Sequence, residues 1–212
     1  MQFITDPMGI ETRSMEIIAP YLTEYNLTDA ETKVYSRIIH ASGDPEYAPI
    51  IKIHPTAITA VEQAIKAGKN IYTDVEMVRT GINKKRLAKY GGSVECKIAA
   101  PEIAVLAKDQ GITRSMAAMQ TLATDLHGAV LAVGNAPTAL FEVIRLMKET
   151  GLRPAAIIGV PVGFVGAAES KEELIKQSPV PYITVRGNKG GSPIAASIIN
   201  AILYMIDNEP RG

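Results

Sequence analysis

The 212-residue chain has little cysteine, few aromatic residues and no excess of charge of either sign. Its single cysteine, Cys96, cannot form an internal disulfide, which fits a reducing compartment. Lys plus Arg and Asp plus Glu number 22 each, so no net field attracts nucleic acid or an anionic membrane. Tryptophan is absent and aromatic residues make up 5%, too few for a base-stacking platform. We therefore expect no nucleic-acid partner, and local recognition of any anion.

Long apolar runs and targeting segments are also missing from the sequence. No run of about 18 uncharged apolar residues occurs, so no membrane partner is expected. The N-terminus lacks the basic, apolar and small-residue succession of a signal peptide, which predicts a cytoplasmic protein. The three histidines, His40, His54 and His127, lie far apart in the sequence and Cys96 stands alone, which predicts no metal site.

Short apolar runs alternate with helical patterns after residue 55. Runs at residues 70–73, 94–98, 129–133, 155–160 and 182–185 predict five strands separated by helices. Strands with this spacing pair in parallel, and their continuous apolar character predicts burial on both faces. We expect one domain over residues 1–212, an α/β fold in which a five-stranded parallel sheet forms a three-layer α/β/α sandwich. Residues 1–55 are expected to be mainly helical.

Glycine-rich turns follow three of the predicted strands, at residues 134–138, 159–166 and 187–192. A parallel sheet delivers all these turns to one edge, where glycine permits close approach and helix N-termini attract anions. Together with Lys171 and Lys189, they predict a cleft for a ligand with several anionic groups. No turn matches a nucleotide fingerprint, since Lys189 is misplaced for a phosphate loop and Pro161 stands where the dinucleotide motif needs glycine. A plain tight turn is the alternative for any one of them.

One predicted helix carries an arginine and a histidine near its end. Thr28 and Glu31 have the spacing of a capping box, and Gly43 ends the helix. Arg37 and His40 are three residues apart and therefore lie on neighbouring positions of one helix face. The helix end favours an imidazolium, so the pair would suit binding an anion and protonating it. An ordinary amphipathic helix is the alternative reading of these residues.

Several motifs resemble those of the precorrin-8X methylmutases, a family that includes the cobalt-precorrin-8 methylmutases. They are Arg37-x-x-His40-Ala41-x-Gly43, Asp74-x-Glu76-Met77-Val78, Thr113-Arg114-Ser115, residues 134–140, residues 159–171 and Gly187-x-x-Gly190-Gly191-Ser192. The resemblance implies a flavodoxin-like fold, a homodimer and a role in cobalamin biosynthesis. It also implies an isomerase that moves a methyl group from carbon eleven to carbon twelve of precorrin-8X or cobalt-precorrin-8. The product would be hydrogenobyrinate or cobyrinate, expected to be held tightly.

The resemblance further implies roles for single residues. It implies that His40 is catalytic and that Ser14 and Arg37 bind the substrate. Because the tetrapyrrole substrate carries many carboxylates, the remaining residues expected to bind it are Arg114, Ser115, Asn135, Lys171 and Lys189. An intramolecular shift requires no cofactor, and any cobalt would belong to the substrate. Two alternatives stay open, namely a non-catalytic tetrapyrrole carrier and a generic flavodoxin-like domain for a phosphate ligand.

Overall fold

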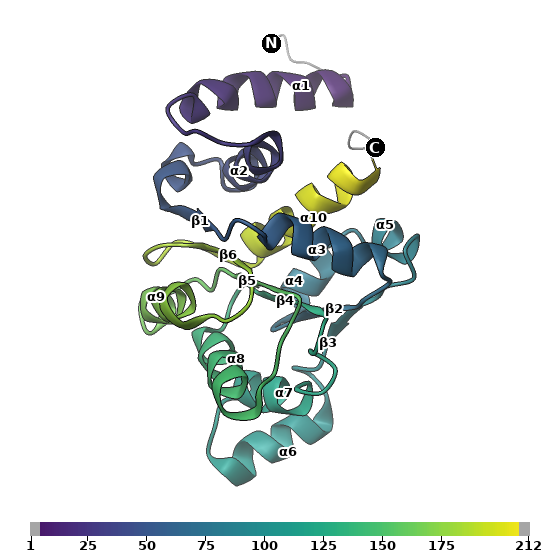
Figure 1. Cartoon of the computed structure of the whole chain (residues 1–212), viewed down its shortest axis with the longest axis vertical. Helices are drawn as coiled ribbons and strands as arrows, with labels where there is room; N and C mark the ends of the chain where they lie inside the picture. Colours follow the sequence, from purple (N-terminus) through teal and green to yellow (C-terminus); the bar gives the residue numbers. More distant parts are fainter. Residues whose placement is uncertain (1–4, 208–212) are drawn as a thin grey trace.

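The computed structural model describes residues 5–207, in which one six-stranded sheet lies between two layers of helices (Figure 1). The strand order is β1-β6-β5-β4-β2-β3. The strands are β1 (Ile51–Ile53), β2 (Ile71–Thr73), β3 (Val94–Cys96), β4 (Val130–Val133), β5 (Ala156–Gly159) and β6 (Tyr182–Val185). All five predicted strands are present and pair in parallel. Numbered among themselves from β2, they have the order 2-1-3-4-5, which is the flavodoxin-like order.

The sixth strand, β1, corrects the prediction of a purely parallel five-stranded sheet. It pairs antiparallel with β6, with Ile51 opposite Val185 and Ile53 opposite Ile183. Its three residues lie in the part of the chain that was expected to be mainly helical. Ile51–Ile53 precedes the alternation of strands and helices that revealed the other strands, and β1 forms because the edge of β6 offers backbone hydrogen-bonding groups.

Six α-helices lie on one side of the sheet, with α10 at the centre and α1 packed on the outside of α2 (Figure 1). They are α1 (Pro7–Ile18), α2 (Asp29–Ser42), α3 (Ala57–Lys66), α4 (Glu76–Gly81), α5 (Lys84–Ala88) and α10 (Ser192–Asp207). Helix α10 packs against α2, α3 and α4 and buries Ile194, Ile198 and Ile202 in the same cluster as Val130 of β4. The short α4 and α5 were not predicted, because single turns lack a readable period.

Four helices cover the opposite face. They are α6 (Pro101–Gln110), α7 (Arg114–Thr121), α8 (Pro137–Thr150) and α9 (Ala167–Gln177). Leu131 and Val133 point into this layer, whereas Val130 and Ala132 point to the other, as expected for successive strand residues. Both faces of β4 are thus buried, which explains its continuous apolar sequence.

Two 3-10 helices, η1 (Ala19–Leu22) and η2 (Pro45–Ile50), flank α2. The predicted capping box of α2 is present, since the Glu31 N–H donates to Thr28 Oγ1 and the Thr28 N–H donates to Glu31 Oε2. Gly43 ends α2 with φ at 65°. Helix α9 begins at Ala167, so Lys171 lies in its second turn.

Candidate active site

Asp74 organises the edge where the carboxyl ends of the parallel strands meet. It follows β2, is fully buried, and accepts hydrogen bonds from the N–H groups of Gly134, Asn135 and Ala136 at 2.9, 2.8 and 2.7 Å. Burial raises the pKa of the Asp74 carboxyl, and the three N–H donors oppose that shift. The carboxylate therefore fixes the turn after β4. In the sequence, Asp74 stands out only as the first residue of the Asp74-x-Glu76-Met77-Val78 motif, since no local pattern shows which backbone a carboxylate will reach.

This turn lies at the topological switch point of the sheet. β2 and β4 are neighbours, but the chain leaves β2 toward β3 on one side and leaves β4 toward β5 on the other. Ligands of open α/β sheets bind in the crevice outside such a point. Asn135, which was predicted to bind the substrate, is exposed there.

Arg114 and Ser115 lie beside the same turn as the first two residues of α7. Thr113 caps that helix by accepting the Met116 N–H at 3.2 Å and donates its own hydroxyl to Thr138 Oγ1 at 3.0 Å. Because Thr138 is in the first turn of α8, the N-termini of α7 and α8 lie side by side. The structure thus brings Arg114, Ser115 and Asn135 into one neighbourhood, with two helix N-termini that favour anions.

The turns after β5 and β6 are joined by their backbones. The Gly191 N–H donates to the Val160 carbonyl at 2.9 Å, and the Gly163 N–H donates to the Asn188 carbonyl at 3.2 Å. A Cβ at Gly190 would lie 2.4 Å from the Val160 oxygen, which explains why glycine occupies this position. At the tip of the β5–α9 turn, Phe164 and Val165 are each 90% exposed.

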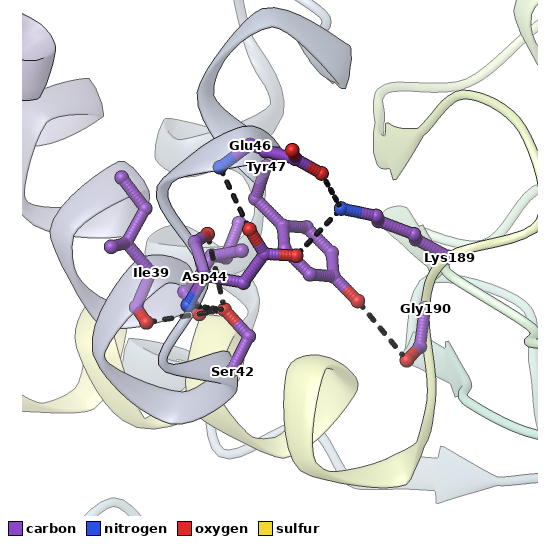
Figure 2. A network of polar contacts seen from close by, with 8 residues as sticks. Ile39, Ser42, Asp44, Glu46, Tyr47, Lys189 and Gly190 are labelled. Carbon is purple, nitrogen blue, oxygen red and sulfur yellow. Dashed lines mark hydrogen bonds and ion pairs between the residues drawn. The ribbon is translucent and has the colours of Figure 1, made fainter.

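The two lysines predicted to bind the substrate contact this joined unit. Lys171 is fully buried, and its ammonium donates to the Lys189 carbonyl at 2.6 Å. The Lys189 ammonium lies 2.6 Å from Asp44 Oδ2 and 2.8 Å from Glu46 Oε2 (Figure 2). Burial lowers the pKa of Lys171 to about 8, whereas the hydrogen bonds to Asp44 and Glu46 raise the pKa of Lys189. Substrate binding by either lysine stays a prediction.

Arg37 contacts two other helices. Its guanidinium lies 2.5 Å from Glu11 Oε1 of α1 and 5.3 Å from the centre of the Tyr204 ring of α10. The Arg37 and Glu11 side chains are each only 16% exposed. Ser14, one turn after Glu11 on α1, donates its hydroxyl to the Ile10 carbonyl at 2.8 Å. Ser14 and Arg37 therefore belong to one packed group of helices, although their contacts with a substrate stay predictions.

His40 lies in the last turn of α2 and is half-buried. Within residues 5–207 its imidazole makes no hydrogen bond or ion pair, so both ring nitrogens are available to a ligand. Asp44, four residues later, is held by Lys189, which brings the end of α2 to the carboxyl edge of the sheet. The His40 helix thus adjoins the glycine turns, although it precedes the parallel strands in sequence.

Neither a metal-binding cluster nor a membrane-spanning helix is found over residues 5–207. Over the described part of the chain, no group of three or more His, Cys, Asp or Glu side chains is arranged to hold a metal ion. The same residues include no helix with the length and apolar character needed to cross a membrane. The absence of a cofactor stays a prediction.

The chain is similar to known proteins along nearly its whole length. The family model described as precorrin-8X methylmutase matches residues 9–205, which include both His40 and the glycine turns. The chain belongs to the precorrin-8X methylmutase family. The cobalt-precorrin-8 methylmutase of Priestia megaterium is 43% identical over 202 residues, covering 95% of this chain and 89% of the relative.

Relatives named precorrin-8X methylmutase and relatives named cobalt-precorrin-8 methylmutase both match this chain. The precorrin-8X methylmutase of a Sinorhizobium species is 39% identical over 201 residues, covering 94% of this chain and 95% of the relative. The solved structure of the precorrin-8X methylmutase from Thermus thermophilus has a TM-score of 0.86 at 33% identity, covering 94% of this chain and 98% of that one. The fold and the family therefore agree with the resemblance drawn from the motifs.

Proposed function

We propose that this methylmutase moves a methyl group from carbon eleven to carbon twelve of precorrin-8X or its cobalt complex in cobalamin biosynthesis. The observation that carries the proposal is the family match over residues 9–205 together with the position of His40. The end of α2 is held against the glycine turns at the carboxyl edge of the sheet. An acid at that point can act on a ligand bound in the crevice.

The polar groups at this edge suit a macrocycle with many carboxylates. Arg114 is exposed at the N-terminus of α7, and Asn135 is exposed in the adjoining turn. An arginine can bind a carboxylate through two parallel hydrogen bonds, and helix N-termini add further N–H donors. The exposed Phe164 and Val165 can pack on the apolar face of a flat ring.

In the proposed mechanism, His40 as imidazolium gives a proton, or a strong hydrogen bond, to a ring nitrogen of the substrate. This withdraws electron density from the conjugated system and eases migration of the methyl group. As the product regains its conjugation, the proton returns to His40, so no net proton is consumed. General acid catalysis of this kind contributes ~10²–10⁴ to a rate. Fixing the macrocycle in one orientation contributes further.

The proposal extends to the setting of the enzyme. The reaction needs no cofactor from the protein, and cobalt enters only as part of the substrate. We further propose a cytoplasmic homodimer that retains the corrin product tightly.

The test of the proposed function is His40→Ala, assayed by the absorption change of precorrin-8X and of cobalt-precorrin-8. We expect turnover to fall by at least ~100-fold, because the acid is lost, while the pigment still binds. His127→Ala is the matched control, since His127 is exposed and lies in the segment between α7 and β4. Near-normal turnover in His40→Ala would refute the catalytic role.

The same assay separates the alternatives. A non-catalytic carrier would form a coloured complex whose spectrum does not change with time in the wild-type protein. A generic phosphate-ligand domain would bind a nucleotide and ignore the corrinoid. Comparing the two substrates also decides whether cobalt is present in the ring when the methyl group moves.

A further inference from the structure

Lys171 is a costly feature if it serves only packing. Its side chain is fully buried on α9, and its one hydrogen bond among the described residues goes to the Lys189 carbonyl at 2.6 Å. Removing an ammonium from water costs free energy, and a single neutral carbonyl offsets only part of that cost. With no exposed surface, Lys171 is also poorly placed to meet a substrate carboxylate. We therefore look for its role in the hydrogen bond by which it holds the backbone of the β6–α10 turn.

The Lys189 side chain, which extends from the same turn, makes the next contact. The Lys189 ammonium lies between Asp44 Oδ2 and Glu46 Oε2, and Figure 2 shows it reaching across from the turn to these two carboxylates. Tyr47 adds a hydrogen bond from its hydroxyl to the Gly190 carbonyl at 3.3 Å. A substrate carboxylate at Lys189 would have to displace two ion pairs that are already formed.

Hydrogen bonds then connect Asp44 with the last turn of α2. The Asp44 N–H donates to Ser42 Oγ at 3.2 Å, and the Ser42 hydroxyl donates to the Ile38 carbonyl at 2.9 Å. The Asp44 carboxylate also accepts the Glu46 N–H at 2.9 Å and so caps η2. His40 lies between Ile38 and Ser42 in this last turn. A continuous set of contacts thus connects buried Lys171 to the turn that carries the candidate acid.

We propose that Lys171 and Lys189 are positioning residues, which fix the last turn of α2 and thereby the direction of His40, and that they do not bind the substrate. The proposal rests on the proposed function of His40. Asp44 is the third member of this set, which we call the α2 latch (Lys171, Lys189 and Asp44). A shift of about 1 Å in a reacting group can cost up to ~10²-fold in rate, so the latch can control kcat without contacting the ring.

The first test is a double-mutant cycle with Lys189→Met, Asp44→Asn and the double variant. Each single change should lower kcat by about tenfold and leave KM and the dissociation constant of the pigment within about threefold. The double variant should be no slower than either single one, because both break the same contact. Lys66→Met is the matched control, since Lys66 forms an exposed pair with Glu62 on α3.

The opposite pattern would overturn the proposal. If Lys189 binds the substrate, Lys189→Met weakens pigment binding more than tenfold, while Asp44→Asn removes one of the two carboxylates that hold the ammonium and leaves binding equal or tighter. Additive losses of kcat in the double variant would also contradict a shared role.

Lys171→Met tests the buried end of the latch. Methionine keeps the apolar stem and removes the ammonium, so the melting temperature should stay equal or rise while kcat falls about tenfold. A purely structural lysine would give the opposite result, a lower melting temperature with an unchanged kcat, and that result would remove Lys171 from the latch.

Hydrogen exchange separates failure of this proposal from failure of the proposed function. In Lys189→Met and Asp44→Asn, amides of residues 40–50 should exchange faster than in the wild type, whether or not the protein turns over a corrinoid. Unchanged exchange there would overturn the latch. A wild type without turnover but with the expected exchange would overturn only the function of His40.

Discussion

Two polar clusters hold the turns at the carboxyl edge of the sheet, and they differ in burial and in reach. In the Asp74 cluster, a fully buried carboxylate accepts hydrogen bonds from three backbone N–H groups of the next turn. The cluster around Lys189 is partly exposed, with the Lys189 side chain at 39%, and it joins side chains 145 residues apart in sequence. One cluster fixes a turn, and the other fixes the end of a helix.

The Asp74 cluster stabilises the fold, whereas the cluster around Lys189 sets the orientation of the end of α2. Three N–H donors around Asp74 would be left buried and unpaired if the carboxylate were removed, at about 1–3 kcal/mol for each. Partly exposed ion pairs such as Lys189 with Asp44 contribute little to stability, because water competes for both charges. Their effect is to choose one orientation for the end of α2.

The largest expected effect comes from Asp74→Ala. Because it leaves buried donors without an acceptor, the free energy of unfolding should fall by about 3–5 kcal/mol, measured by urea denaturation. Asn135→Ala is the matched control, since its backbone N–H still reaches Asp74, and it should change stability by less than about 0.5 kcal/mol. Equal stability of the two variants would show that Asp74 does not hold the turn.

An intermediate effect is expected from Gly190→Ala, which disturbs the backbone beside Lys189 without changing a charge. The new Cβ would lie 2.4 Å from the Val160 oxygen at a φ of 154°, so the cost should be about 3 kcal/mol. Gly43→Ala has a positive φ but open space around the new Cβ, and should cost about 1 kcal/mol. The midpoints of thermal unfolding would rank the two variants, and the reverse order would contradict the close approach.

The smallest expected effect is a change in the pH at which the Asp44 carboxyl titrates. The hydrogen bond from Lys189 lowers the pKa of Asp44, so this carboxylate supports the fold above its unfolded pKa of about 3.8. That support is lost as the pH falls through the lower folded pKa. In Lys189→Met, the midpoint of the Asp44 carboxyl carbon, followed by NMR, should rise toward 3.8. Lys66→Met should leave it in place, and an unmoved midpoint in Lys189→Met would break the assignment of the pair.

Much of the fold was readable from local pattern. The five parallel strands and the capping box at Thr28 and Glu31 were predicted and confirmed, because buried strands and capped helices have recognisable periods and spacings. β1 was missed because it precedes the alternation of strands and helices, and α4 and α5 were missed because one or two turns are too short to show a helical period. Motif resemblance pointed to the family, and the family match confirmed it.

The candidate site was only partly readable. Residue types and motifs singled out Arg37 and His40, but not the ion pair of Arg37 with Glu11 or the burial of Lys171. A lysine beside a glycine turn looks the same in the sequence whether its side chain faces a ligand or a carbonyl group of its own chain. The partners of a charged side chain depend on segments far away in sequence, and no local pattern records them.

Local patterns in the sequence were enough to predict the five parallel strands, the helix that carries His40 and membership of the methylmutase family. These follow from periodicity, caps and motifs, which act over a few residues. Only the tertiary structure decided that Asp74 holds the turn after β4, and that Lys189 draws the end of α2 to the sheet. Both depend on contacts across 60 residues or more, because charges and hydrogen-bonding groups find partners by proximity in space.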